Sequence, residues 1–113
     1  MTDRELLEQA ATAYFGADGF EWNSCAGFSG CIQYIPNGLT HYVEWNPLAD
    51  DGDALRLAVK LRITPRVHLQ GYSVAVTAQC IVDSYTEICG DDEMAATRRA
   101  IVRAAAEIGR AMP

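Results

Sequence analysis

The sequence predicts a single α+β domain in which three helices pack on one face of an antiparallel sheet of four or five strands. Two observations indicate this fold class. Apolar residues recur at helical spacing in three segments, about residues 3–14, 50–62 and 92–111, and capping residues precede each one. Between them, short runs of alternating apolar and polar residues are separated by turn-forming residues. The chain has 113 residues, the length of one domain, so residues 1–113 are expected to fold together.

The first predicted helix begins after Thr2. Thr2 and Glu5 form the T-x-x-E pattern, in which the two side chains cap backbone N–H groups of the first turn. Residues 17–31 interleave aromatic residues with glycines, a pattern too irregular for a helix and too rich in glycine for a firm strand. We therefore expect a loop with short extended pieces over residues 23–30.

A β-hairpin is predicted next. Extended runs at residues 32–35 and 39–45 flank Pro36-Asn37-Gly38, and Asn and Gly tolerate the positive φ angles of a tight turn. Three further strands are expected at residues 66–70, 73–82 and 85–89, of which the second has the strongest alternation of apolar and polar residues.

The second and third helices are predicted to begin at acidic clusters. Carboxylates at a helix start accept hydrogen bonds from free N–H groups and complement the helix dipole. In the second helix, Leu55, Ala58 and Leu61, with Val59 beside them, are expected to form the apolar stripe, and Thr64-Pro65 ends the helix. In the third helix, the residues expected on the apolar stripe are Met94, Ile101, Ala105, Ile108 and Met112.

Composition and charge narrow the classes of function. The net charge of −6 gives the chain no overall basic footprint for nucleic acid. The apolar runs are only a few residues long, far short of the roughly 20 needed to cross a bilayer. The N-terminus lacks the pattern of a secretory signal, so a cytoplasmic location is expected.

No catalytic or cofactor motif is present, and no cofactor is expected. The four cysteines, at 25, 31, 80 and 89, have spacings that do not suit a structural zinc site, and we expect them to be reduced. The acidic clusters at 50–53 and 91–93 could hold a divalent metal or act as an acid/base pair, which would make the chain a small enzyme or metal-binding domain. Helix capping explains both clusters without a ligand, and it is the favoured interpretation.

A basic helix face and an aromatic group offer two candidate binding surfaces. The third helix has a row of arginines that could contact phosphates in a small nucleic-acid-associated module. The members of this row are Arg98, Arg99, Arg103 and Arg110. Aromatic residues are dense between positions 14 and 45, and Trp and Tyr among glycines make good anchors for a partner protein.

Two stretches resemble a group of small proteins from tailed bacteriophages and prophages. They are WNPLADDGDALRLAVKL at residues 45–61 and AATRRAIVRAAAEIG at residues 95–109. The resemblance implies no catalytic residues. It implies a phage or prophage accessory protein in the host cytoplasm, and small acidic phage proteins often bind and block a host protein, including CRISPR effectors.

The leading hypothesis is therefore a non-enzymatic protein that binds and inhibits a host protein, such as an anti-CRISPR or another anti-defence inhibitor. Carboxylates would meet a basic groove on the target and compete with its nucleic acid. A homodimer is also compatible with the alanine-rich helices. The residues expected to contact the partner are Trp22, Phe28, Tyr34, Tyr42, Asp50, Asp51, Asp91 and Asp92.

Overall fold

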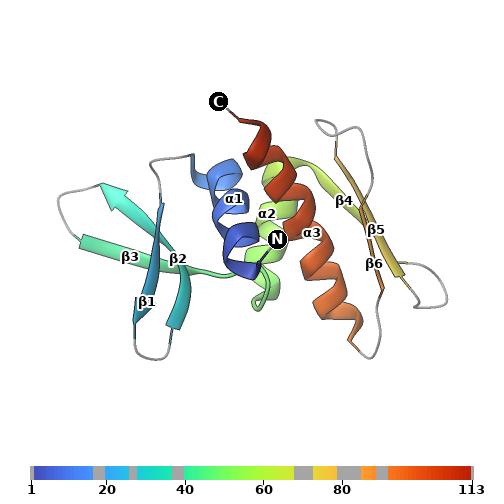
Figure 1. The fold of residues 1–113 in the computed structure, drawn as a ribbon, viewed down its shortest axis with the longest axis horizontal. Coiled ribbons are helices and arrows are strands. Elements are labelled where there is room, and N and C mark those ends of the chain that lie inside the picture. Colours follow the sequence, from blue (N-terminus) through green and yellow to red (C-terminus); the bar gives the residue numbers. More distant parts are fainter. Residues whose placement is uncertain are drawn as a thin grey trace.

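The computed structural model describes residues 2–16, 20–25, 28–36, 40–67, 73–78, 85–88 and 92–112. The elements follow the order αβββαβββα (Figure 1). Their bounds are α1 Asp3–Phe15, β1 Phe20–Cys25, β2 Phe28–Pro36, β3 Thr40–Trp45, α2 Asp51–Leu61, β4 Ile63–Val67, β5 Ser73–Ala78, β6 Tyr85–Ile88 and α3 Glu93–Ala111.

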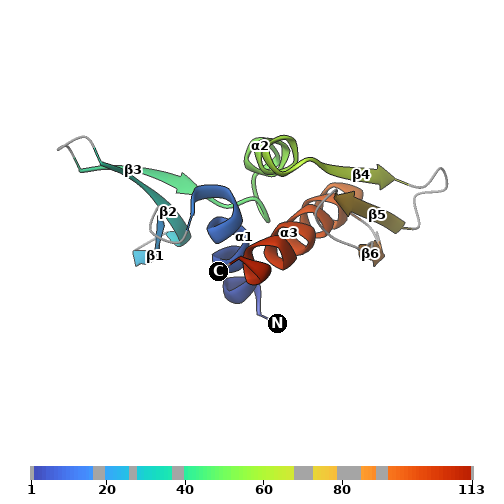
Figure 2. The same cartoon turned by 90° about the horizontal axis from the view of Figure 1, so that it is seen from above.

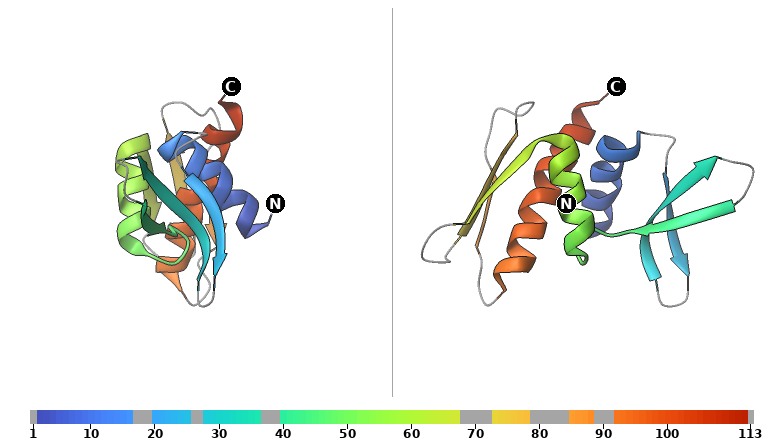
Figure 3. Two further views of the ribbon diagram at one scale, coloured as in Figure 1. Left: turned by 90° about the vertical axis from the view of Figure 1, so that its left-hand side faces the viewer. Right: turned by 180° about the vertical axis from the view of Figure 1, so that it is seen from behind.

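The helices form a central layer with an antiparallel sheet on each side. Sheet A has the order β1-β2-β3 and sheet B the order β4-β5-β6. Sheet A packs on α1, whereas α3 contacts all three strands of sheet B on one side and α1 and α2 on the other. Figures 1 and 3 show the helix layer between the two sheets, and the longest axis of the molecule measures 49 Å.

This arrangement confirms the α+β class with three helices and antiparallel pairing, but the prediction of one sheet with helices on a single face is wrong. The strands form two separate three-stranded sheets. The reason lies in α3, which buries residues around most of its circumference, so it needs packing partners on opposite sides. Helix α2 also separates β3 from β4 along the chain, and these two strands do not pair.

The three helices begin within one residue of their predicted starts, at the predicted caps. The Thr2 hydroxyl accepts a hydrogen bond from the Glu5 N–H at 3.1 Å. Asp50 and Asp92 accept from the N–H groups of Asp53 and Ala95 at 2.8 Å and 2.9 Å. Figures 1 and 3 show that the helices run in roughly the same direction, so their acidic N-terminal ends lie toward the same end of the molecule.

The loop with short extended pieces predicted over residues 23–30 is wrong at residues 23–25 and 28–30, while residues 26 and 27 lie outside the described residues. Strands β1 and β2 pair antiparallel there, from Phe20 opposite Gln33 to Cys25 opposite Phe28. The glycines weaken the local preference for a strand, yet the pairing satisfies the backbone N–H and C=O groups of both segments. The predicted hairpin is confirmed in β2 and β3, while residues 37–39 of its turn lie outside the described residues.

In the second half of the chain, all three predicted strands are present, and β5 and β6 begin at the predicted residues, while the predicted ends at 68–70 and 89 lie outside the described residues. Strand β4 starts at Ile63 and contains Pro65, which is tolerated because β4 is an edge strand. Helix α2 ends at Leu61, before the predicted Thr64-Pro65 stop, and Arg62 has a left-handed φ of 57°. Residues 79–82 of the second predicted strand lie outside the described residues.

The core is one cluster that connects the helix layer to both sheets, and alanines make it compact. Gly109 of α3 lies against Gln9 of α1 so closely that a Cβ on Gly109 would come within 1.8 Å of the Gln9 carbonyl oxygen. Trp45, at the end of β3, is buried and its ring contacts Tyr14 and Phe15 of α1. These contacts fix sheet A on the helix layer.

The predicted apolar stripe of α2 is partly wrong. Ala58 is buried, but the other fully packed apolar positions are Ala54 and Leu57, while Leu55 and Val59 are 65% and 68% exposed. Helix α2 has apolar residues on two sides, and α3 and β4 cover only one of them. On α3, Ile101 and Ala105 are buried as predicted, whereas the end residues of the stripe, Met94 and Met112, are exposed.

Candidate interaction surface

A hollow of about 460 Å³ lies where sheet A meets the helix layer. Three elements form its walls: the start of α1, the middle of β1 and the connection between β3 and α2. The lining residues on which the argument depends are Arg4, Leu7, Trp22, Asn46 and Leu48. The hollow thus combines an aromatic ring, two apolar side chains, a cation and an amide.

Trp22 forms the aromatic wall and is held by α1. Its side chain is half-buried and packs against the core cluster. The guanidinium carbon of Arg4 lies 4.9 Å from the centroid of the Trp22 ring, which is a cation–π distance. Arg4 also donates from Nε to Glu8 at 2.6 Å, so the guanidinium is fixed from a second direction. Two of the residue types most frequent in protein-binding hot spots, Trp and Arg, therefore stand together in a defined geometry.

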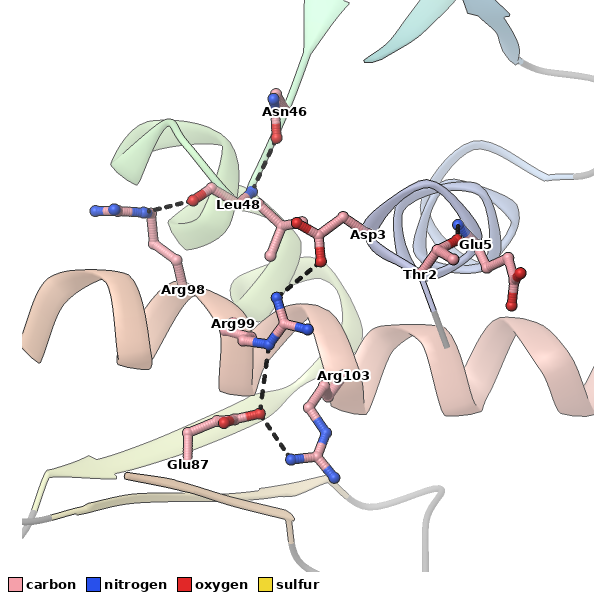
Figure 4. A network of polar contacts seen from close by, with 9 residues as sticks. All are labelled: Thr2, Asp3, Glu5, Asn46, Leu48, Glu87, Arg98, Arg99 and Arg103. Atoms are coloured by element: carbon pink, nitrogen blue, oxygen red, sulfur yellow. Dashed lines mark hydrogen bonds and ion pairs between the residues drawn. The ribbon is translucent and has the colours of Figure 1, made fainter. Parts of the chain in front are cut away.

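Side-chain hydrogen bonds fix the floor of the hollow. The Leu48 N–H donates to the Asn46 side-chain oxygen at 3.1 Å, and the Asn46 N–H donates to the Asp53 carboxylate at 2.9 Å. Arg98 of α3 donates from Nε to the Leu48 carbonyl at 2.9 Å (Figure 4). The connection between β3 and α2 is thereby tied to both α2 and α3.

An ion-pair network extends from the rim of the hollow across α3 to sheet B. Arg99 contacts Asp3 at 2.9 Å and Glu87 of β6 at 3.8 Å, and Arg103 contacts the same Glu87 oxygen at 2.7 Å (Figure 4). The network joins the start of α1 to β6 through α3. Because the pairs are partly exposed, each contributes at most about 1 kcal/mol, and their main effect is to set the positions of the elements.

Of the predicted partner-contact residues, Trp22 lines the hollow. In the backbone register of sheet A, Trp22 lies opposite Cys31 and Cys31 opposite Trp45, and the Trp22 and Trp45 side chains pack on the core cluster beside α1. Tyr34 of β2 lies opposite Tyr42 of β3 in the backbone register of the sheet. Phe28 is the first residue of β2.

The acidic residues of the predicted set act as caps and ion-pair partners. Asp50 caps α2 and lies 3.8 Å from Arg56, Asp51 pairs with Arg98 at 2.7 Å, and Asp92 caps α3. The hydrogen bond and charge of the neighbouring Asp53 raise the pKa of Arg56 above its ordinary value. The favoured interpretation as helix caps is confirmed for Asp50 and Asp92, whereas Asp51 is an ion-pair partner and Asp91 lies outside the described residues.

The arginine row of α3 also has partners within the chain. Arg98 pairs with Asp51, Arg99 with Asp3 and Glu87, Arg103 with Glu87, and Arg110 with Glu107. A phosphate would have to compete with these carboxylates.

In comparisons with family models, curated proteins and solved structures, no significant match to this chain was found. Within the described ranges, no helix has the length and hydropathy required to span a bilayer. In the same part of the chain, no three His, Cys, Asp or Glu residues are grouped closely enough to hold a metal ion.

Proposed function

We propose that the chain is a non-enzymatic phage or prophage accessory protein that binds and inhibits a host protein, and that the Trp22 hollow is its anchor site. The observation that carries this proposal is the stack of Arg4 on Trp22 above a hydrogen-bonded floor. An anchor site of this kind needs little reordering on binding, which lowers the entropic cost of association.

The lining indicates which partner group would enter. Leu7 and Leu48 favour an apolar or aromatic side chain, while the Asn46 amide can donate or accept hydrogen bonds and the Asp3 carboxylate at the rim can accept them. The net charge of −6 favours a partner with a basic surface. A nucleic-acid-binding defence complex, such as a CRISPR effector, has such a surface, and this is the form of target that we propose.

The test is capture of the partner with tagged chain from a lysate of the host bacterium. Wild-type chain is compared with Trp22→Ala and Arg4→Ala, and Met112→Ala serves as a matched control because Met112 is exposed and lies at the end of α3. One dominant partner that Met112→Ala retains and both hollow variants lose would support the proposal. Equal recovery with all four proteins would refute the placement of the anchor. Because the Arg4 side chain is 62% exposed, Arg4→Ala is expected to fold, and a loss of binding in this variant is then not a result of unfolding.

The nucleic-acid alternative has less support, because the arginines on which it depends already contact carboxylates. It predicts a gel shift at low salt that weakens steeply as salt rises.

The enzyme or metal alternative places a cation at residues 50–53, where Asp50 and Asp53 are engaged with Arg56 and with backbone N–H groups. That alternative predicts a rise in melting temperature with Mg²⁺, Ca²⁺ or Mn²⁺.

A further inference from the structure

One exposed side of α2, beside the start of α3, carries an uncovered apolar surface. Leu55 and Val59 lie one helical turn apart and are 65% and 68% exposed. Asp51 continues the same side of the helix, since positions 51, 55 and 59 fall within about 80° of one another at 100° per residue. Arg62, the C-cap with a φ of 57°, follows directly after the last turn. We call these four residues the α2 outer face. In the view of Figure 2, α2 lies at the top of the helix layer, and no described helix or strand lies above it.

An apolar groove adjoins this face. It has a volume of about 270 Å³ and lies between α2, the edge strand β4 and the start of α3. Its walls include Ala54, Leu55, Pro65, Met94 and Ile101, and Met94 is 55% exposed. Exposed Leu, Val and Met side chains side by side are more than the scattered apolar residues of an ordinary surface, and such patches mark contact sites.

The charges on the α2 outer face make it complementary to a copy of itself. Asp51 is at the N-terminal end, where its side chain is 60% exposed although one of its oxygens pairs with Arg98 at 2.7 Å, and Arg62 follows the C-terminal end. Among the described residues, Arg62 has no ion-pair partner. The helix dipole adds to this polarity, because it is positive at the end with Asp51 and negative at the end with Arg62.

We propose that the α2 outer face is the contact surface of a symmetric homodimer, in which the α2 helices of two copies pack antiparallel across a two-fold axis. With the axis at the level of Leu57 and a rise of 1.5 Å per residue, Leu55 and Val59 lie about 3 Å on either side of it. Leu55 of one copy is then level with Val59 of the other. Asp51 lies about 9 Å to one side and Arg62 about 7.5 Å to the other, so each Asp51 meets the Arg62 of the partner copy.

A two-fold interface of this kind is closed, since the same patch is used on both copies. Pro65 and the neighbouring groove lie at its edge, and the exposed Met94 side chain is available to extend the apolar contact. The antiparallel arrangement also sets the two α2 dipoles in opposition, which is favourable. The dimer leaves the Trp22 hollow free, because that hollow lies between α1, β1 and the β3–α2 connection.

The first test is the mass of the full chain in solution, measured by light scattering after gel filtration. The expected mass of the wild type is twice the 12.3 kDa of one chain. The double variant Leu55→Glu/Val59→Glu is expected to be a monomer, and Met112→Glu, which places the same charge on another exposed apolar residue, is expected to remain a dimer. A monomeric wild type at all concentrations, or a dimer that survives the double substitution, would overturn the proposal.

A charge-exchange experiment tests the antiparallel geometry. Asp51→Arg and Arg62→Asp each place like charges at both ends of the interface, so each variant alone is expected to dimerise at least tenfold more weakly than the wild type. When the two variants are mixed, each end regains an Arg and an Asp, and the heterodimer is expected to form with near wild-type affinity. A melting curve checks that Asp51→Arg folds without its pair to Arg98. Failure of two folded variants to form the heterodimer would contradict the antiparallel arrangement.

Discussion

Replacement of Gly109 by alanine tests how closely α1 and α3 approach each other. A Cβ at this position would lie 1.8 Å from the Gln9 carbonyl oxygen, 2.8 Å from its carbonyl carbon and 3.2 Å from the Ala13 nitrogen. Ordinary contact starts at 3.4 Å, so the helices would have to separate by about 1.6 Å at this point. The atoms that clash belong to backbone and cannot rotate away.

The expected cost follows from two opposing effects. Overpacking of a core costs about 1–3 kcal/mol, and a backbone clash belongs at the upper end. In the opposite direction, alanine stabilises a helix interior by about 1 kcal/mol relative to glycine. The net loss is therefore about 2 kcal/mol. For a chain of this size, it lowers the melting temperature by about 8 °C.

The matched control is Gly52→Ala in the first turn of α2. There the new Cβ would lie 3.2 Å from the Asp50 Oδ2 that caps α2 and 3.3 Å from the end of the Arg56 side chain, so these side chains need to shift by only a few tenths of an ångström and no backbone atom is in the way. We expect Gly52→Ala to be neutral or stabilising by up to about 1 kcal/mol. Thermal unfolding of both variants, followed by circular dichroism, checks the difference. A Gly109→Ala variant as stable as Gly52→Ala would refute the close approach of α1 and α3.

The remaining predictions concern the acidic residues. Asp53→Ala should cost about 1–3 kcal/mol of unfolding free energy in urea titrations, because Asp53 is buried and its loss leaves the Asn46 N–H unpaired. Asp51→Ala should cost no more than about 1 kcal/mol of unfolding free energy, since the ion pair of Asp51 with Arg98 is at the surface. An equal loss of stability in Asp53→Ala and Asp51→Ala would contradict the buried role of Asp53 and the surface role of Asp51. Asp92→Ala should cost about 1 kcal/mol through loss of the α3 cap, and Asp92→Ser should restore most of it; a ligand role for this carboxylate would predict no rescue.

The helices were predictable because their signals are local. Thr2, Asp50 and Asp92 each cap the turn that follows them within three residues, so a short stretch of sequence carries the whole interaction. The sheets depend on distant pairing. Strand β1 was missed because its stability comes from six cross-strand pairs with β2, and the glycines in this region conceal that pairing in the sequence. The division into two sheets depends on α3 packing on both sides, which no local pattern shows.

The candidate site was predictable only in part. Trp22 could be identified by its residue type, but its neighbours Arg4 and Leu48 come from other elements, and only the fold brings them together. The Asn46-Pro47 pair was a usable signal, because Asn before a turn often accepts a hydrogen bond from the backbone two residues on, as it does from Leu48. The apolar periodicity of α2 could not show which of its two apolar sides faces the core, so Leu55 and Val59 were placed on the wrong side.

The most direct test of the proposed function is the affinity of the purified chain for its captured host partner, measured by calorimetry. Trp22→Ala and Arg4→Ala remove the two members of the anchor, and Met112→Ala is the control. If the Trp22 hollow is the anchor, Trp22→Ala should weaken binding by about 2 kcal/mol, or roughly 30-fold, and Arg4→Ala by about tenfold, while Met112→Ala stays within twofold. Wild-type affinity in a folded Trp22→Ala variant would contradict the central claim that this hollow binds the partner.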